Sequence, residues 1–258
     1  MQEIEVIRTK EDVQLKDPIL IVGLPGVGHV GKLVAEHIVE ELDAEKIIEI
    51  YSHHFPPQVL VDENSEIQLV NNELFVCHTE KHDIIVLIGD HQSSSTEGHY
   101  KLCTVYLELA QEFGVQRIYT LGGFPTGQLT HSNEVLGAVN NIELIEELKE
   151  YGVTFKEGEP GGGIVGASGL LLGLSKFKNI DAACLMGLTS GYLVDPKSAQ
   201  SLLKVICKIF EIDIDEGPLE ERAKEMEKIV ARLKEVEQQQ KGMPEMGTVN
   251  DEDLRYIG

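Results

Sequence analysis

Residues 19–42 read ILIVGLPGVGHVGKLVAEHIVEEL, and this stretch decides the fold. Its first four residues form an apolar run between turn-forming residues, which is typical of a strand buried on both faces. In its last part, apolar residues recur three and four positions apart and mark one face of a helix. That face carries Val30, Leu33, Val34, His37, Ile38 and Leu42. Four glycines and a proline lie between the two parts. The stretch therefore predicts a strand, a tight glycine turn and a helix whose N-terminus either holds an anion or packs against its neighbours.

Two phosphate-binding motifs overlap in this turn. Gly26, Gly28 and Gly31 match the G-x-G-x-x-G pattern of dinucleotide-binding proteins, and Glu49 lies near the position of a ribose-binding acid. The same glycines match the beginning of G-x-x-x-x-G-K, but Leu33 stands where a Ser or Thr binds magnesium, which argues against a nucleoside triphosphatase. The alternative is that these glycines let strand, turn and helix pack closely, and we favour this second interpretation.

Composition excludes several classes of partner. The 258 residues carry a net charge of −22, which argues against binding to nucleic acid or to anionic membranes. No apolar run approaches the length of a membrane span, and the first residues, MQEIE, do not resemble a signal peptide. The four cysteines lack C-x-x-C spacing, so they predict buried thiols of a cytoplasmic protein and neither disulfides nor a zinc site.

Strand and helix patterns alternate as far as Ile214, which predicts a three-layer α/β core domain over residues 1–215. The alternation favours a mixed, mainly parallel sheet. Three short strand patterns, Val59–Val61, Ile67–Val70 and Leu74–His78, are separated by turn residues. They predict an antiparallel section inserted in this sheet.

Two polar clusters invite a chemical interpretation. His53 and His54 are paired, but no acidic or histidine partner stands at ligand spacing, so we favour a packed loop over a metal site. Asp90, His91 and Ser93 offer an acid, a base and a nucleophile after the buried strand 84–88. A capped helix start accounts for this second cluster better than catalysis does.

Residues 166–170, GASGL, resemble the G-x-S-x-G nucleophile motif, but Leu170 replaces the last glycine and no strand precedes the segment. We therefore reject a hydrolase. With no convincing catalytic constellation, the sequence predicts a protein that is not an enzyme and that holds no cofactor and no metal.

Beyond the core, residues 216–241 predict a C-terminal helix. Its apolar positions follow 4-3-4-3 spacing, here named the heptad seam: Leu219, Ala223, Met226, Val230 and Leu233. The seam packs either on the core of its own chain or on other subunits, and we slightly favour oligomerisation. Residues 242–258 predict a flexible tail that ends in apolar residues, Leu254, Tyr256, Ile257 and Gly258 among its last five. Such an ending suggests docking into a pocket of another protein, with the terminal carboxylate as an anchor, although folding back on the domain is nearly as common.

Four segments of the core, each weak alone, are specific in combination and in order. They are Asp17–Gly31, Leu121–Gly127, Gly166–Gly173, and Cys184–Tyr192 followed by Asp195-Pro196. Together they resemble the archaeal branch of the proteasome assembly chaperone 2 family. The resemblance implies a phosphorylase/hydrolase-like α/β core without known catalytic activity, a homo-oligomer, and association with the core proteasome. It also implies that the glycine turn belongs to the fold.

Some members of this family are similar to proteasome activators, whose C-terminal tails end in hydrophobic-tyrosine-any residue and insert between α-subunits. Here Tyr256 is third from the end, so residues 254–258 are a variant of that tail. We expect Leu254, Tyr256, Ile257 and Gly258 to bind α-subunits of the core proteasome. Assembly and activation both stay open as the role, as does a mixed complex with a second family member. The alternative is an enzyme or sensor that binds a nucleotide or another phosphorylated ligand in the turn Gly26–Gly31.

Overall fold

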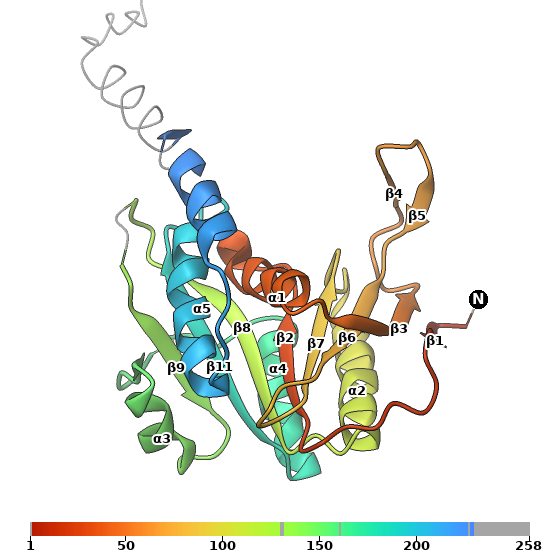
Figure 1. Ribbon diagram of the computed structural model, residues 1–258, viewed down its shortest axis with the longest axis horizontal. Helices are drawn as coiled ribbons and strands as arrows, with labels where there is room; N and C mark the ends of the chain where they lie inside the picture. Colours follow the sequence, from red (N-terminus) through yellow and green to blue (C-terminus); the bar gives the residue numbers. More distant parts are fainter. Residues whose placement is uncertain (1, 130–131, 160, 227, 230–258) are drawn as a thin grey trace, which may run out of the picture.

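The computed structural model describes residues 2–129, 132–159, 161–226 and 228–229, and a nine-stranded sheet forms its centre (Figure 1). In spatial order the strands are β1 (Ile4–Arg8), β3 (Glu45–Ser52), β6 (Asn72–Cys77), β7 (Ile84–Gly89), β2 (Ile19–Gly23), β8 (Arg117–Pro125), β11 (Asp181–Thr189), β9 (Val135–Val139) and β10 (Val153–Thr154). The helices are η1 (Val27–His29), α1 (Val30–Glu41), α2 (Thr96–Glu112), α3 (Leu144–Glu150), α4 (Ala167–Leu174), η2 (Ser175–Lys178) and α5 (Pro196–Phe210).

The sheet is mixed, and its parallel part lies in the middle. Strands β7, β2, β8 and β11 are parallel neighbours. On one side β7 is followed by the antiparallel strands β6, β3 and β1, and on the other β9 runs antiparallel to β11. The predicted α/β class with a mixed sheet is confirmed.

Helices cover both faces of the sheet and make three layers (Figure 1). Helices α1, α3 and α5 pack on one face, and α2 and α4 pack on the other. Along β2, Ile21 faces the first group of helices, whereas Leu20 and Val22 face the second. Because successive side chains of a strand point to opposite faces, this strand is apolar at every position, as its continuous apolar run predicts.

The predicted antiparallel section divides into two parts. Strand β6 joins the main sheet between β3 and β7, as expected. Strands β4 (Val59–Val61) and β5 (Ile67–Leu69) pair only with each other and form a separate hairpin that projects from the body, so their predicted insertion in the sheet is wrong (Figure 1). Pro56 and Pro57 precede β4. Two adjacent residues without a backbone N–H cannot continue the ladder of β3.

The helix expected after the core begins at residue 217, and residues 217–226 are helical. The first seam residues, Leu219 and Ala223, are only 0% and 6% exposed, and Leu219 joins the core cluster that holds α1 and α5. The ring of His37 on α1 contacts the carbonyl oxygen of Asp215 at 2.7 Å and helps to hold the connection in place. The first turns of the seam therefore pack on their own domain. Val230, Leu233 and the predicted tail 242–258 lie outside the described residues.

Candidate functional site

The glycine turn, residues 23–31, lies at the carboxyl end of β2, beside the ends of β8 and β11. Helix η1 occupies residues 27–29 of the turn, with Gly28 at φ 62° and His29 at φ 52°. His29 stands at the N-cap of α1, and its side chain makes no capping hydrogen bond. Carboxyl ends of parallel strands are the usual ligand-binding edge of an α/β sheet, so this turn is the first candidate site.

The chain itself fills the space beside three of the glycines, Gly23, Gly28 and Gly31, whereas Gly26 has room for a Cβ atom beside it. A Cβ atom on Gly31 would overlap the carbonyl oxygen of Leu121 in β8, and one on Gly28 would lie 2.8 Å from the Thr189 hydroxyl at the end of β11. A Cβ atom on Gly23 would overlap Ala35 of α1. These glycines let α1 and η1 approach the sheet closely, which supports the packing interpretation.

Other segments of the sequence pattern meet at the same edge. The backbone N–H of Asp195 donates to the Gly28 carbonyl at 2.9 Å, while its side chain caps α5 by accepting from the N–H of Ser198. Gln92 bridges two more segments: its amide donates to the Pro25 carbonyl at 2.6 Å and accepts from the N–H of Ala167 at 2.9 Å. Four stretches far apart in sequence thus form one hydrogen-bonded and packed edge.

The groups that a phosphate or ribose would need are already engaged. The Lys32 ammonium donates to the Gly89 carbonyl at 2.9 Å and pairs with Glu36 at 3.1 Å. Glu49 lies on β3, which is separated from β2 by β6 and β7, and it pairs with Lys46 at 2.6 Å. The hydrogen bond from Lys46 is the main reason that the pKa of Glu49 is lowered. Glu49 is therefore not on the strand next to the turn, where a ribose-binding acid lies in dinucleotide-binding proteins.

The residues Asp90, His91 and Ser93 come close in sequence but contact different partners. The carboxylate of Asp90 accepts from the N–H of Asn71 at 3.3 Å, and the His91 ring lies 2.5 Å from the Gln58 amide. The Ser93 hydroxyl donates to the Ser95 carbonyl at 2.9 Å. They form no relay of acid, base and nucleophile.

The competing interpretation of the same loop is confirmed. The Ser95 hydroxyl accepts from the N–H of Gly98 at 3.1 Å, and Ser95 is the N-cap of α2. Glu97 lies in the first turn, where a negative charge is favourable.

The His53-His54 loop packs on its surroundings as predicted. The ring of His54 contacts the Glu3 carboxylate at 2.9 Å, and the His54 carbonyl accepts from the N–H of Ser94 at 2.8 Å. Within the part of the chain that the structure describes, no three His, Cys, Asp or Glu side chains are grouped as metal ligands.

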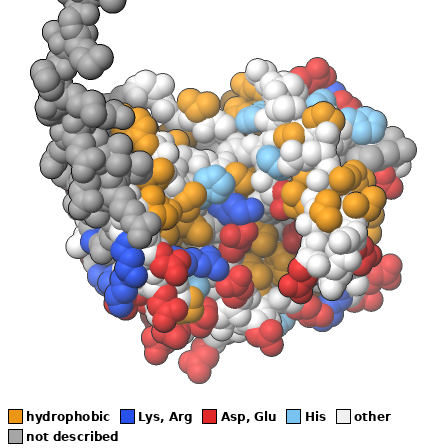
Figure 2. All heavy atoms as spheres, turned by 90° about the horizontal axis from the view of Figure 1, so that it is seen from above, with side chains coloured by type: hydrophobic (Ala, Val, Ile, Leu, Met, Phe, Trp, Pro, Cys, Tyr) orange, Lys and Arg blue, Asp and Glu red, His pale blue; other side chains and the backbone are white. Residues whose placement is uncertain are grey.

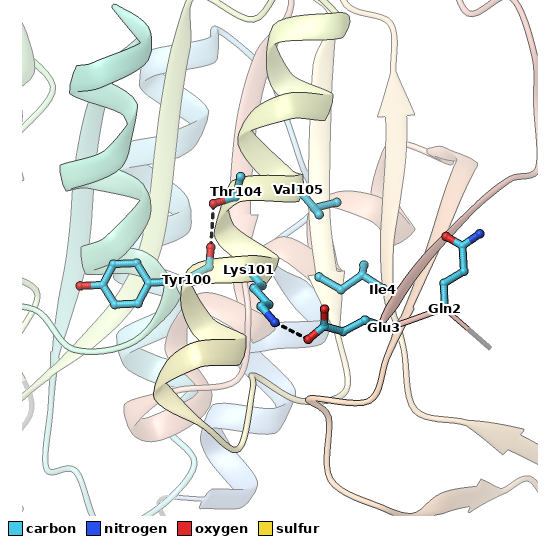
Figure 3. Close-up of a pocket in the computed structure, with 7 residues that line it drawn as sticks. All are labelled: Gln2, Glu3, Ile4, Tyr100, Lys101, Thr104 and Val105. Atoms are coloured by element: carbon cyan, nitrogen blue, oxygen red, sulfur yellow. Dashed lines mark hydrogen bonds and ion pairs between the residues drawn. The ribbon is translucent and has the colours of Figure 1, made fainter.

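A shallow groove lies between the start of β1 and α2 (Figure 3). Its charged groups pair with each other: Lys101 bonds to Glu3 and lies 2.7 Å from Glu97. The hydrogen bond that Lys101 donates to Glu3 is the largest cause both of the lowered pKa of Glu3 and of the raised pKa of Lys101. The charged groups of the groove are therefore occupied by ion pairs, and its remaining lining is largely apolar. Such a groove offers few polar groups that could orient a small ligand.

The four cysteines are separate thiols, as predicted. Cys77, Cys103 and Cys184 are buried and Cys207 is half-buried. Burial raises the pKa of Cys103 to about 12 and that of Cys184 to about 11, which removes the thiolate that nucleophilic chemistry requires. Among the described residues, no helix is long and apolar enough to cross a membrane.

Sequence reasoning missed one surface. One face of the β4–β5 hairpin consists of four aliphatic side chains that are all exposed: Val59 at 45%, Val61 at 63%, Ile67 at 68% and Leu69 at 52%. The sequence contains one indication of this surface, the apolar triplet Val59–Val61. Three apolar residues in a row place aliphatic side chains on both faces of a short strand. The predicted binding residues Leu254, Tyr256, Ile257 and Gly258 lie outside the described residues.

Comparisons with known proteins agree with this architecture. The chain is 40% identical over 254 residues to the uncharacterized protein MJ1210 of Methanocaldococcus jannaschii, which covers 98% of this chain and 97% of the relative. The crystal structure of Pyrococcus furiosus PbaB, an archaeal proteasome activator, has a TM-score of 0.85 and 39% identity, over 91% of this chain and 100% of that one. PbaA of the same organism, an archaeal homolog of proteasome-assembly chaperone, has a TM-score of 0.74 at 24% identity, over 93% and 95% of the two chains, and supports the fold alone.

These comparisons are in line with the resemblance drawn from the four sequence segments. The model of the PAC2 family matches residues 20–234, which include all of the sheet except β1, and the chain belongs to the PAC2 family.

Proposed function

We propose that this chain is a cytoplasmic, non-enzymatic protein that binds the core proteasome as a homo-oligomer, as an assembly chaperone or an activator. The observation that carries the proposal is the 39% identity to PbaB, an archaeal proteasome activator, over 100% of that chain. The candidate phosphate-binding side chain Lys32 and the candidate catalytic side chains Asp90, His91 and Ser93 add support, because all four make hydrogen bonds within the fold.

We further propose that residues 254–258 are the part that contacts α-subunits of the proteasome. Leu254, Tyr256 and Ile257 are apolar residues in an otherwise polar and acidic stretch. Leu219 and Ala223 anchor the described part of the preceding helix, residues 217–226, on the core. Several copies of a weakly binding tail in one oligomer would supply affinity through multivalency.

The test is co-elution with purified core proteasome, measured by size exclusion with light scattering. We expect the full chain to co-elute with the proteasome, and a chain lacking residues 254–258 to keep its own oligomeric mass but to lose co-elution. Tyr256→Ala should weaken binding, whereas Val249→Ala, at an apolar position outside residues 254–258, should not. Cleavage of a fluorogenic peptide in the same samples separates activation from docking without gate opening.

Two results would contradict the proposal at different levels. If the truncated chain still co-elutes, the tail is not the contact, although proteasome binding stands. If neither form co-elutes, the proteasome is not the partner of this chain.

A further inference from the structure

The β4–β5 hairpin presents an aliphatic face that the described part of the chain leaves exposed. Its register pairs Val59 with Leu69 and Val61 with Ile67. Cross-strand partners point to the same side, so these four side chains form one face, and Leu60 and Gln68 form the other. The four are between 45% and 68% exposed. We call them the hairpin face.

Most strands of the main sheet bury apolar side chains, whereas no residue of β4 or β5 is buried. A two-stranded hairpin is marginally stable alone, and a contiguous exposed apolar patch on a soluble protein marks an interaction surface. The hairpin projects from the body, so the body cannot cover it (Figure 1). Hydrophobic side chains also gather on this side of the molecule when it is seen from above (Figure 2).

The hairpin face continues without interruption into a groove at its base. The groove is lined by Tyr51, Phe55, Pro56, Pro57 and Val70, together with Val59 and Leu69, which also belong to the hairpin face. A projecting aliphatic pair, Val61 and Ile67, and a concave apolar groove therefore lie at the two ends of one strip.

We propose that this strip is an interface between two copies of this chain, in which the tip of each hairpin fills the base groove of the other. A two-fold rotation that brings residue i of one copy against residue j of the other also brings j against i, so a strip that carries both a projection and a matching groove is complementary to itself. In this dimer the two-fold axis passes near Val59 and Leu69, which belong to both the hairpin face and the groove. The inference deepens the self-association in the proposed function and is independent of proteasome binding.

The charges at the hairpin fit this antiparallel arrangement. Asp62, Glu63 and Glu66 lie at the tip, and Asp62 already accepts from the N–H groups of Asn64 and Glu66 at 2.8 Å. A parallel arrangement would bring the two acidic tips together, which is unfavourable in a chain of net charge −22. In the antiparallel arrangement, the tip carboxylates of one copy approach His53, a hydrogen-bonding side chain that lines the base groove of the other.

The experiment compares two charge substitutions at neighbouring positions of the full chain, Ile67→Glu on the hairpin face and Gln68→Glu on the opposite face. Analytical ultracentrifugation over a concentration series measures the dissociation constant of self-association. We expect Ile67→Glu to raise that constant at least about 30-fold, the effect of losing a residue that carries much of the binding energy, and Gln68→Glu to leave it within about threefold. Circular dichroism checks that both variants keep the fold.

A cross-link tests the same geometry without adding charge. Under mild oxidation, Val59→Cys should form a disulfide-linked dimer because it lies near its own counterpart, whereas Leu60→Cys, on the other face of the same strand, should not. Comparable cross-linking of both variants, or an Ile67→Glu protein that associates as strongly as the wild type, would overturn the inference while leaving self-association intact. A wild-type chain that is monomeric at every concentration would overturn both this inference and the self-association in the proposed function.

Discussion

The glycine turn and the β4–β5 hairpin contrast in how they use their surroundings. The turn matches two ligand-binding motifs, yet Gly23, Gly28 and Gly31 are packed against other parts of the same chain. The hairpin matches no motif, yet it exposes four aliphatic side chains, Val61 and Ile67 most of all. A glycine pattern therefore indicates that other atoms come close to the backbone. Only the structure shows whether those atoms belong to the protein or to a ligand.

Gly31→Val should produce the largest loss of stability. The new side chain would overlap the backbone of Leu121 in the central strand β8, which cannot move without disturbing the sheet. We expect the free energy of unfolding to fall by about 3 kcal/mol or more in chemical denaturation. The control is Gly173→Ala, at an exposed helical position with no atom within 4 Å, which should be neutral or slightly stabilising. If Gly31→Val is as stable as the wild type, the turn is not a packed element.

Gln92→Ala should produce the second-largest loss of stability on the packed edge. It removes the side chain that joins the Pro25 carbonyl to the N–H of Ala167, and it leaves two polar backbone groups of the packed edge without that partner. We expect a loss of about 1–2 kcal/mol and faster hydrogen exchange at Ala167. Gln116→Ala removes a local, exposed hydrogen bond to Gly114 and should cost no more than about 0.5 kcal/mol. Equal effects of the two substitutions would mean that the bridge contributes nothing specific.

The hairpin face should matter little for the folding of a single chain. Ile67→Ala removes a side chain that is 68% exposed, so we expect a loss below about 1 kcal/mol at protein concentrations where the chain is dissociated. The identical change Ile85→Ala, in the buried strand β7, should cost about 2–5 kcal/mol. Urea denaturation of both variants makes the comparison, and a similar loss at the two positions would place the hairpin within the folding core.

Glu49→Gln should have the smallest effect, and that effect should depend on pH. The folded-state pKa of Glu49 is lowered, chiefly by the hydrogen bond from Lys46, so its ionised form stabilises the fold above the unfolded value of 4.5. This contribution is lost as the pH falls through the folded-state pKa. Because Lys46 is 36% exposed, we expect a loss of only about 0.5 kcal/mol at pH 7, with wild type and variant converging in acid. A difference that persists at low pH would assign Glu49 a role other than this ion pair.

Much of the fold follows from local pattern. The apolar run 19–22 and the helical spacing from Val30 to Leu42 need no information from the rest of the chain, and β2 and α1 form there. The N-cap at Ser95 is equally local, because a hydroxyl three residues before Gly98 satisfies a free N–H of the helix end. Such features are predictable because their causes lie within one or two helical turns.

The errors concern long-range partners. Val59–Val61 and Ile67–Leu69 have the composition of strands in a sheet, but strand composition does not tell which other strand they pair with. The heptad seam poses the same problem, since Leu219 packs on its own core while the spacing alone also suits a second subunit. For the candidate site, the sequence identified the glycine turn as the segment to examine. It could not reveal that Leu121 fills the space beside Gly31 and that Thr189 fills the space beside Gly28.

The burial of the four thiols has a consequence for the chemistry of the whole molecule. A cysteine reacts with alkylating reagents through its thiolate, and the raised pKa of the Cys77 thiol, about 12, leaves almost none of that form at neutral pH. Alkylation of a buried cysteine in the native chain therefore requires local unfolding around it. The alkylation rate then measures how often that part of the domain unfolds. We expect two different alkylation rates, because Cys207 on α5 is half-buried whereas Cys184 is buried on strand β11. The order in which the two are modified would report which part of the domain opens first.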